Sequence, residues 1–241
     1  MTAADDARHP ELAPLRVELR EAMAGTGCPL CRLASKAEHA FIESLNYERV
    51  LDLKTRDDLK ASRGLCQHHG RVWQHVQGAA LGLAIVYRIS VLDLVRDTEP
   101  EGDRRGGLFR RQGRAAAVAD RLEPSLRCPA CTLGSETAAR YGGLLLRDIE
   151  DPDERRLLVA CGGLCLPHLR QVLRLRGAER GHDLLMGAQR EAWSGLMCDL
   201  EEFIRKNDYR FGDEVISPEE GTSWTRALDT LAGLDDAVRG E

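Results

Sequence analysis

The sequence predicts an all-α protein built from two similar helical halves. Alanine, leucine, arginine and glutamate are abundant, whereas valine, isoleucine, phenylalanine and tyrosine are sparse. No stretch shows the alternation of apolar and polar residues that marks a half-buried strand. A cysteine–histidine signature also recurs about a hundred residues further along the chain. Internal repetition of this kind indicates an ancestral duplication and therefore two pseudo-equivalent halves.

The predicted helices follow one another along the chain, and several begin at recognisable signals. Pro29 and Pro129 each suit the first turn of a helix, because proline has a helical φ and no N–H to satisfy. Residues 151–154 also predict a helix start, because they combine a proline with acidic side chains that complement the helix dipole. The longest stretch is expected to break at Gly78 or Gly82. The predicted helices are Leu12–Met23, Pro29–Tyr47, Arg56–Arg63, Cys66–Arg96, Arg111–Leu122, Pro129–Ile149, Asp153–Ala160, Leu166–Arg176, Glu179–Lys206 and a short terminal helix from Ser223 or Trp224 to about Leu234.

A linker is predicted at residues 98–113, between the two halves. It holds Pro100, four glycines and many charges, with almost no apolar residue. The predicted organisation is therefore an N-terminal region with the first repeat at 1–97, the linker at 98–113, the second repeat at 114–211, and a C-terminal tail with a docking helix at 212–241.

Composition excludes several classes of partner. A formal net charge of -5 gives no overall attraction to nucleic acid or to anionic lipid. The longest apolar run, residues 79–95, contains Arg88 and Asp93 and is too polar to span a membrane. The N-terminus does not have the pattern of a secretory signal. We expect a cytoplasmic protein that binds neither nucleic acid nor membrane, and structural disulfides are uncommon in that compartment.

Two short motifs carry the chemistry, and each occurs twice. A Cys-Pro-x-Cys pair is followed by a Gly-Leu-Cys-x-x-His segment in both repeats. The first copy is Cys28-Pro-Leu-Cys31 with Gly64-Leu-Cys66-Gln-His-His69, and the second is Cys128-Pro-Ala-Cys131 with Gly163-Leu-Cys165-Leu-Pro-His168. The alignment extends to Leu33 and Leu133, Ser35 and Ser135, and Arg71 and Arg170.

These motifs predict metal binding. Residues three apart at the start of a helix face the same way, so each motif offers two ligands on one side. The positive end of a helix favours thiolates there. Three sulfurs and one imidazole complete a tetrahedral shell for Zn²⁺. Each half is therefore expected to carry one Cys₃His clamp, two zinc ions per chain in all. The predicted sets are Cys28, Cys31, Cys66 and His69 for one ion, and Cys128, Cys131, Cys165 and His168 for the other.

An iron–sulfur cluster held by the same residues is the main alternative, with an electron-transfer or redox-sensing role. A thioredoxin-like Cys-x-x-Cys pair would need no histidine and would lie in a βαβ pattern that the sequence lacks. His68 aligns with Pro167, so His69 is the predicted ligand of that pair. Cys161 and Cys198 have no cysteine counterparts, and we expect both to be buried in apolar packing.

A second candidate site follows the last long helix. The segment from Glu201 to Phe211 is dense in charges and aromatic residues. Two cations could hold an anionic ligand there while a phenol donates a hydrogen bond. The candidate residues are Lys206, Asp208, Tyr209 and Arg210. A structural clasp that ties down the tail is the favoured alternative.

The doubled CPxC and GLCxxH motifs, followed by KNDYRF and then SW, resemble an uncharacterised bacterial family that occurs in actinobacteria and related lineages. The resemblance extends from about Cys28 to Leu234. It implies that residues 206–211 form one motif, and it implies no activity.

A closed four-ligand zinc shell leaves no position for water or substrate, so the metals are not expected to be catalytic. The sequence thus favours an interaction or regulatory module that binds a protein partner or a small anionic ligand. An enzyme whose pocket is formed by the KNDYRF segment is the further alternative.

Overall fold

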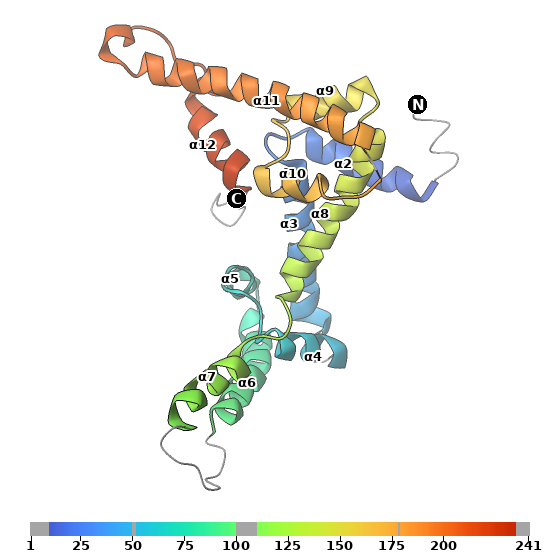
Figure 1. Cartoon of the computed structure of the whole chain (residues 1–241), viewed down its shortest axis with the longest axis vertical. Helices are drawn as coiled ribbons and strands as arrows, with labels where there is room; N and C mark the ends of the chain where they lie inside the picture. Colours follow the sequence, from blue (N-terminus) through green and yellow to red (C-terminus); the bar gives the residue numbers. More distant parts are fainter. Residues whose placement is uncertain (1–9, 50–51, 100–109, 178, 235–241) are drawn as a thin grey trace. The chain divides into compact units, whose positions relative to one another are not determined.

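A computed structural model describes residues 10–49, 52–99, 110–177 and 179–234, and these residues form helices and no strand (Figure 1). The predicted all-α class is therefore confirmed for the described part of the chain. Contacts divide the chain into two compact units. Unit 1 consists of residues 1–36 and 134–241, and unit 2 consists of residues 37–133.

The boundary between the units falls inside two helices. Helix α3 (Pro29–Ser44) begins in unit 1 and ends in unit 2, whereas α8 (Pro129–Asp148) begins in unit 2 and ends in unit 1. This division groups the residues differently from the predicted split at residues 98–113. Of that predicted linker, residues 100–109 lie outside the described residues, and 110–113 belong to a helix.

The two repeats supply the same series of helices in the same order. Each motif lies at the same place in its series, with the Cys-Pro-x-Cys pair at the start of the first helix and the Cys-x-x-His pair at the start of the third. The matching helices are α3 and α8, α4 (Leu53–Ala61) and α9 (Pro152–Ala160), α5 (Gln67–His75) and α10 (Leu166–Val172), and α6 (Ala79–Thr98) and α11 (Glu179–Lys206).

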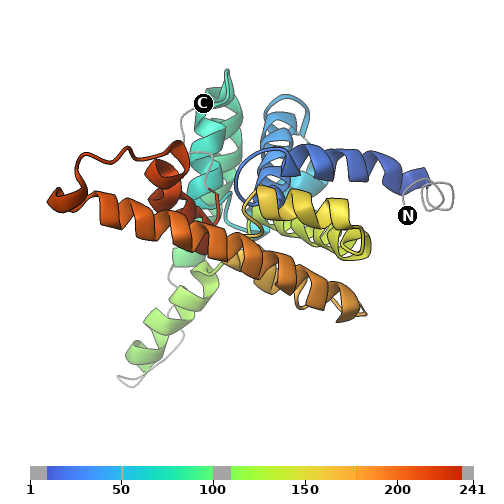
Figure 2. The same ribbon diagram turned by 90° about the horizontal axis from the view of Figure 1, so that it is seen from above.

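Unit 1 is built around an apolar core between α8, α9 and α11. Leu145, Ile149, Leu158 and Leu185 are fully buried in it. Helix α2 (Ala13–Met23), preceded by a 3₁₀ turn at Pro10–Leu12, packs on α9. After a second 3₁₀ turn at Tyr209–Phe211, helix α12 (Pro218–Ala232) folds back against α11, as the orange and red ribbons in Figure 2 show.

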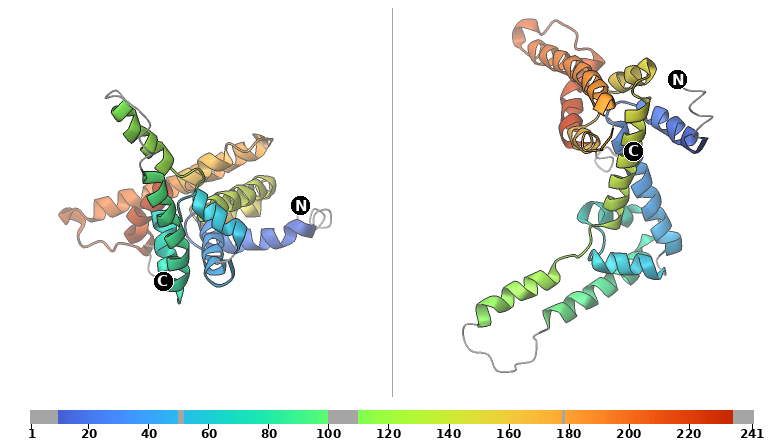
Figure 3. Two further views of the ribbon diagram at one scale, coloured as in Figure 1. Left: turned by 90° about the horizontal axis from the view of Figure 1, so that it is seen from below. Right: turned by 45° about the vertical axis from the view of Figure 1, so that its right-hand side comes forward.

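Unit 2 has a separate core around Trp73. This side chain is fully buried with Ile42, Leu45 and Leu59, and its indole N–H donates to Asn46 Oδ1 at 3.1 Å. The end of α3 continues as a π-helical turn at Leu45–Arg49, and α6 lies beside α7 (Arg110–Leu122) in Figure 3. No described helix, α6 included, has the length and apolar character needed to cross a membrane.

Local signals place most helix ends where the sequence predicts them. The long predicted stretch from Cys66 breaks at Gly78, which has a φ of +75°. Helix α9 begins at Pro152, and the Asp151 side chain accepts from the Asp153 N–H. Helix α12, in contrast, begins at Pro218, earlier than predicted. Ser217 and Glu220 form a reciprocal capping box there, which sets the start of the helix six residues before Trp224.

Candidate metal centres

Unit 1 contains one group of three cysteines and one histidine. Cys28 and Cys31 lie at the start of α3, and Cys165 and His168 lie at the start of α10. The Nδ1 atom of His168 lies 3.2 Å from Cys165 Sγ, 3.3 Å from Cys31 Sγ and 3.6 Å from Cys28 Sγ. The Sγ atoms of Cys31 and Cys165 are 3.6 Å apart. All four ligand atoms therefore surround one point in space.

Unit 2 contains a second group with the same donors. Cys66 and His69 lie at the start of α5, and Cys128 and Cys131 lie at the start of α8. The Nδ1 atom of His69 lies 3.2 Å from Cys66 Sγ, 3.3 Å from Cys131 Sγ and 3.7 Å from Cys128 Sγ. The Sγ atoms of Cys66 and Cys131 are 3.6 Å apart.

The structure brings together all eight predicted ligands, but it pairs them differently from the prediction. Each Cys-Pro-x-Cys pair meets the Cys-x-x-His pair of the other repeat. The groups are Cys28, Cys31, Cys165 and His168 in unit 1, and Cys66, His69, Cys128 and Cys131 in unit 2. The predicted pairing within each repeat was wrong.

The lengths of the helices explain this crosswise pairing. Helix α3 has 16 residues and is about 24 Å long, whereas α4 has nine residues and covers about 14 Å. The return through α4 therefore does not carry α5 back to the start of α3. Instead, α5 shares a core with the C-terminal part of α3, in which Trp73 and Ile42 are both buried. The Cys-x-x-His pair at the start of α5 therefore lies beside the Cys-Pro-x-Cys pair at the start of α8.

The Gly-Leu-Cys sequence forms the turn that delivers each Cys-x-x-His pair. Helices α4 and α9 both end in a Schellman turn, in which Gly64 N–H donates to Leu59 O at 2.7 Å and Gly163 N–H donates to Leu158 O at 2.9 Å. Both glycines have a positive φ. The cysteine two residues later has an extended backbone and begins the next helix. The same turn therefore positions the ligands in both repeats.

Gly163 should be the more sensitive of two unit 1 glycines to substitution by alanine. A Cβ at Gly163 would lie 2.5 Å from Gln189 Nε2, and Gln189 is fully buried and accepts from Leu164 N–H at 2.8 Å. Gly177 also has a positive φ, but among the described residues, apart from its chain neighbours, no heavy atom lies within 4 Å of its Cβ position. We expect Gly177→Ala to cost about 1 kcal/mol and Gly163→Ala about 3 kcal/mol in denaturant unfolding. Equal losses would contradict this account of the turn.

The donors and their spacing fit a tetrahedral zinc ion. With Zn–S near 2.3 Å and Zn–N near 2.0 Å, a tetrahedron has S···S edges of about 3.8 Å and S···N edges of about 3.5 Å. The closest ligand pairs in the two centres are separated by 3.2–3.7 Å. All ligand atoms of a group lie within 4.8 Å of one another. Little movement would bring every donor to its metal distance.

Crowding of the thiols makes each centre suited to a cation. Burial by itself raises the pKa of Cys128, but hydrogen bonds from His69 and two backbone N–H groups outweigh it and lower the pKa to about 6. Burial and the charge of Cys128 raise the pKa of Cys131 to about 12. In unit 1 the pKa of Cys31 is likewise raised by its contacts with Cys165 and Cys28. A divalent cation would allow all three sulfurs of a centre to ionise together.

The pKa values of both ligand histidines are raised. Burial alone would lower the pKa of His69, but its contacts with Cys128 and Glu38 outweigh burial and raise the pKa to about 10. The pKa of His168 is also raised to about 10, where contacts with Cys165 and Cys28 outweigh burial. His69 Nε2 lies 3.3 Å from Glu38 Oε2, although the approach is not aligned as a full hydrogen bond. A carboxylate behind a ligand histidine orients its ring, and Glu38 has that place in unit 2.

The end of the described chain covers the unit 1 centre. The Leu234 backbone N–H donates to Cys31 Sγ at 3.4 Å. A Cβ at Gly233 would lie 3.6 Å from Cys31 Sγ and 3.8 Å from Cys165 Sγ, so the backbone of Gly233 passes close to two ligands. The Leu234 side chain packs against Gly27, next to the first ligand. No motif in the sequence predicts this contact.

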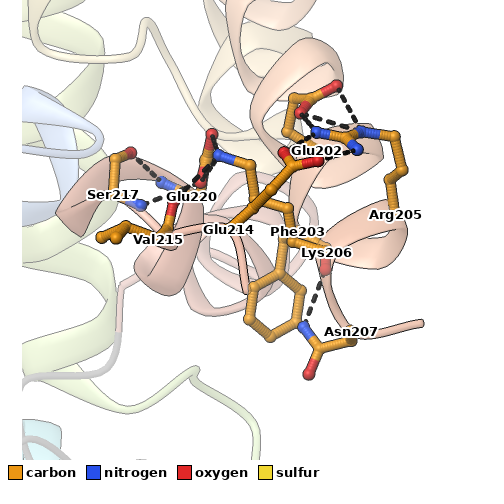
Figure 4. Close-up of polar contacts among 9 residues, drawn as sticks. All are labelled: Glu202, Phe203, Arg205, Lys206, Asn207, Glu214, Val215, Ser217 and Glu220. Carbon is orange, nitrogen blue, oxygen red and sulfur yellow. Dashed lines mark hydrogen bonds and ion pairs between the residues drawn. The ribbon is translucent and has the colours of Figure 1, made fainter. Parts of the chain in front are cut away.

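The four candidate residues of the KNDYRF segment do not converge on one point. Lys206 Nζ pairs with Glu220 at 2.7 Å and donates to Val215 O at 3.0 Å (Figure 4). Arg210 pairs with Asp208 at 2.7 Å, and Tyr209 is 91% exposed. Because Glu220 also belongs to the capping box of α12, Lys206 ties α11 to the start of that helix. This arrangement is that of a structural clasp.

Neighbouring residues of the clasp add further ion pairs. Arg205 pairs with Glu202 at 2.8 Å and with Glu214 at 2.5 Å (Figure 4). Its guanidinium also lies 4.8 Å from the centroid of the Phe211 ring. The segment 202–214 therefore folds on itself at the end of α11.

Two further cysteines remain outside both groups of ligands. Cys161 is buried, as predicted, and its thiol donates to Leu158 O at 3.1 Å. Cys198 is exposed, so the expectation that it is buried was wrong. His68 is not among the grouped ligands and packs edge-on against the His69 ring, with the ring centroids 4.8 Å apart.

A model of a protein family matches residues 15–236, and the family is described as one of unknown function, DUF6062. The match covers most of the chain, so the chain belongs to this family. Comparison with curated proteins gives no match. Comparison with solved structures gives none either.

Proposed function

We propose that this member of the DUF6062 family binds two structural zinc ions and acts as an interaction or regulatory module in the cytoplasm. The observation that carries the proposal is the convergence of three sulfurs and one imidazole nitrogen within 4.8 Å, in each of two separate groups. A Cys₃His shell is common among structural zinc sites. Each centre would join segments far apart in the sequence, as Cys31 and Cys165 illustrate, and so would stabilise its unit directly.

The spacing of the donors supports a single ion over an iron–sulfur cluster. A cluster places several irons and sulfides between its protein ligands, which must then lie further apart than the ligands of one ion. The contacts of 3.2–3.7 Å in these centres match the edges of a mononuclear tetrahedron. Zinc is the metal that most often occupies such a shell of sulfur and nitrogen.

The absence of an open coordination position supports a non-enzymatic role. A catalytic zinc keeps one position for water or substrate, whereas four protein ligands fill the tetrahedron. The clasp residues give no second candidate for catalysis, because Lys206, Asp208 and Arg210 pair with neighbouring groups. We infer that the metals hold helices in place and that the helical surfaces bind a protein partner or a small anionic ligand.

Metal analysis of protein purified without oxygen tests the proposal. We expect two zinc per chain and no acid-labile sulfide. Iron with sulfide would favour the alternative, a cluster protein with an electron-transfer or redox-sensing role. Iron without sulfide, or one metal per chain, would also contradict two structural zinc ions.

A further inference from the structure

The two centres have the same donors but different surroundings. In unit 1 all three ligand cysteines are buried, and Cys165 is only 1% exposed. In unit 2 only Cys128 is buried, whereas Cys66 and Cys131 are half-buried. A thiolate reacts with a dissolved oxidant only if the oxidant can reach its sulfur. The cysteines of unit 2 are more exposed, so we expect them to react faster than those of unit 1.

Hydrogen bonds to sulfur add to the difference in expected reactivity between the two centres. In unit 1 the Leu234 N–H donates to Cys31 Sγ, and the backbone of Gly233 passes close to Cys31 and Cys165. A donated N–H withdraws electron density from a thiolate and makes it a weaker nucleophile. In unit 2 two backbone N–H groups donate to the sulfur of Cys128, which is already buried. The accessible sulfurs of that centre are Cys66 and Cys131.

We propose that the unit 2 centre is a site of reversible oxidation, at which hydrogen peroxide converts Cys66 and Cys131 to a disulfide and releases the zinc. Their Sγ atoms are 3.6 Å apart, so a shift of about 1.5 Å brings them to the S–S bond length. Cys31 and Cys165 in unit 1 are equally close, but both are buried, and Cys31 also accepts the Leu234 N–H. The unit 1 centre therefore keeps its metal under conditions that open the unit 2 centre.

The reaction balances with peroxide as the only oxidant. One thiolate attacks a peroxide oxygen and the O–O bond breaks, which gives a sulfenic acid and, after protonation, water. The second thiolate attacks the sulfenic sulfur, the S–S bond forms, and hydroxide leaves and is protonated to a second water. The two sulfurs lose two electrons and the peroxide gains two. With two of its four ligands joined to each other, the zinc ion dissociates.

This inference rests on the proposed zinc chemistry, so the test begins with full-length protein shown to hold two zinc per chain. Hydrogen peroxide is added, released zinc is followed with a chromogenic chelator, and disulfides are mapped by mass spectrometry after alkylation. We expect the first zinc to leave at least about tenfold faster than the second. The first disulfide should join Cys66 to Cys131, and a thiol reductant with added zinc should restore two ions.

Three variants locate the cause of the difference. Leu234→Pro removes the N–H that Cys31 accepts and should speed release of the second zinc about tenfold. Leu234→Ala keeps that N–H and should have a smaller effect. Cys198→Ser removes an exposed thiol outside both centres and should leave both rates unchanged.

Equal rates of release from the two centres would overturn the proposal. So would a first disulfide within unit 1, or loss of the first zinc while Cys66 and Cys131 remain reduced. A starting protein with iron, or with fewer than two zinc ions, would instead refute the proposed function before any peroxide is added.

Discussion

Replacing Cys28 and Cys165 together by serine should leave one tightly bound zinc per chain, whereas replacing Cys28 and Cys66 should leave none. In the crosswise arrangement the first pair belongs to one centre, so the unit 2 set remains complete. The second pair takes one ligand from each centre, and a zinc shell that loses a ligand binds far more weakly. Zinc retained after dialysis against a chelator of moderate affinity measures the difference.

Both variants change two cysteines to serine, so each serves as the control for the other. Pairing within each repeat predicts the reverse result, with one zinc retained by Cys28→Ser/Cys66→Ser and none by Cys28→Ser/Cys165→Ser. That reversed pattern would refute the crosswise assignment of the ligands.

Removal of both metals with a strong chelator should unfold the protein. Binding at a structural zinc site contributes about 10–16 kcal/mol, and the whole stability of a typical domain is about 5–15 kcal/mol. In unit 1 the centre connects the start of α3 to α10, and in unit 2 it connects α5 to the start of α8. Without these connections the remaining core contacts do not balance the chain entropy. Far-UV circular dichroism should show loss of most of the helical signal, and zinc, but not magnesium, should restore it.

Chelated protein that keeps its helical signal and its thermal midpoint would show that the apolar cores fold each unit unaided. The cores around Leu145 in unit 1 and Trp73 in unit 2 would then be sufficient. The metals would in that case act on function and not on stability.

The ligands could be predicted from the sequence because their signal is local. A proline that starts a helix fixes the direction of Cys28 and Cys31, and the same turn positions Cys66 and Cys165. The pairing of the motifs could not be predicted in this way. Either pairing gives two complete Cys₃His sets, and the choice depends on where α5 packs along α3. That placement depends on the core that Trp73 and Ile42 share, and these two residues lie far apart in the sequence.

In the C-terminal region, too, local signals could be predicted from the sequence and long-range contacts could not. Ser217 and Glu220 have the spacing of a capping box, so the start of α12 could have been predicted from the sequence. The pairing of Lys206 with Glu220 required knowledge that α12 folds back on α11, and the charges alone were equally consistent with a ligand site. The contact of Leu234 with Cys31 joins residues that are 203 positions apart, and no sequence motif predicts it.

Crosswise pairing has a consequence for synthesis of the protein on the ribosome. Cys28, Cys31, Cys66 and His69 emerge first, and they form a complete Cys₃His set before any native partner exists. A zinc ion captured at that stage would link residues that the finished protein holds in different units. During maturation, Cys66 and His69 would then have to exchange Cys28 and Cys31 for the cysteines of α8 as their partners. Cys28 and Cys31 could complete their own site only after Cys165 and His168 had been synthesised. The fold thus favours late delivery of zinc, or a first metal complex weak enough to exchange its ligands.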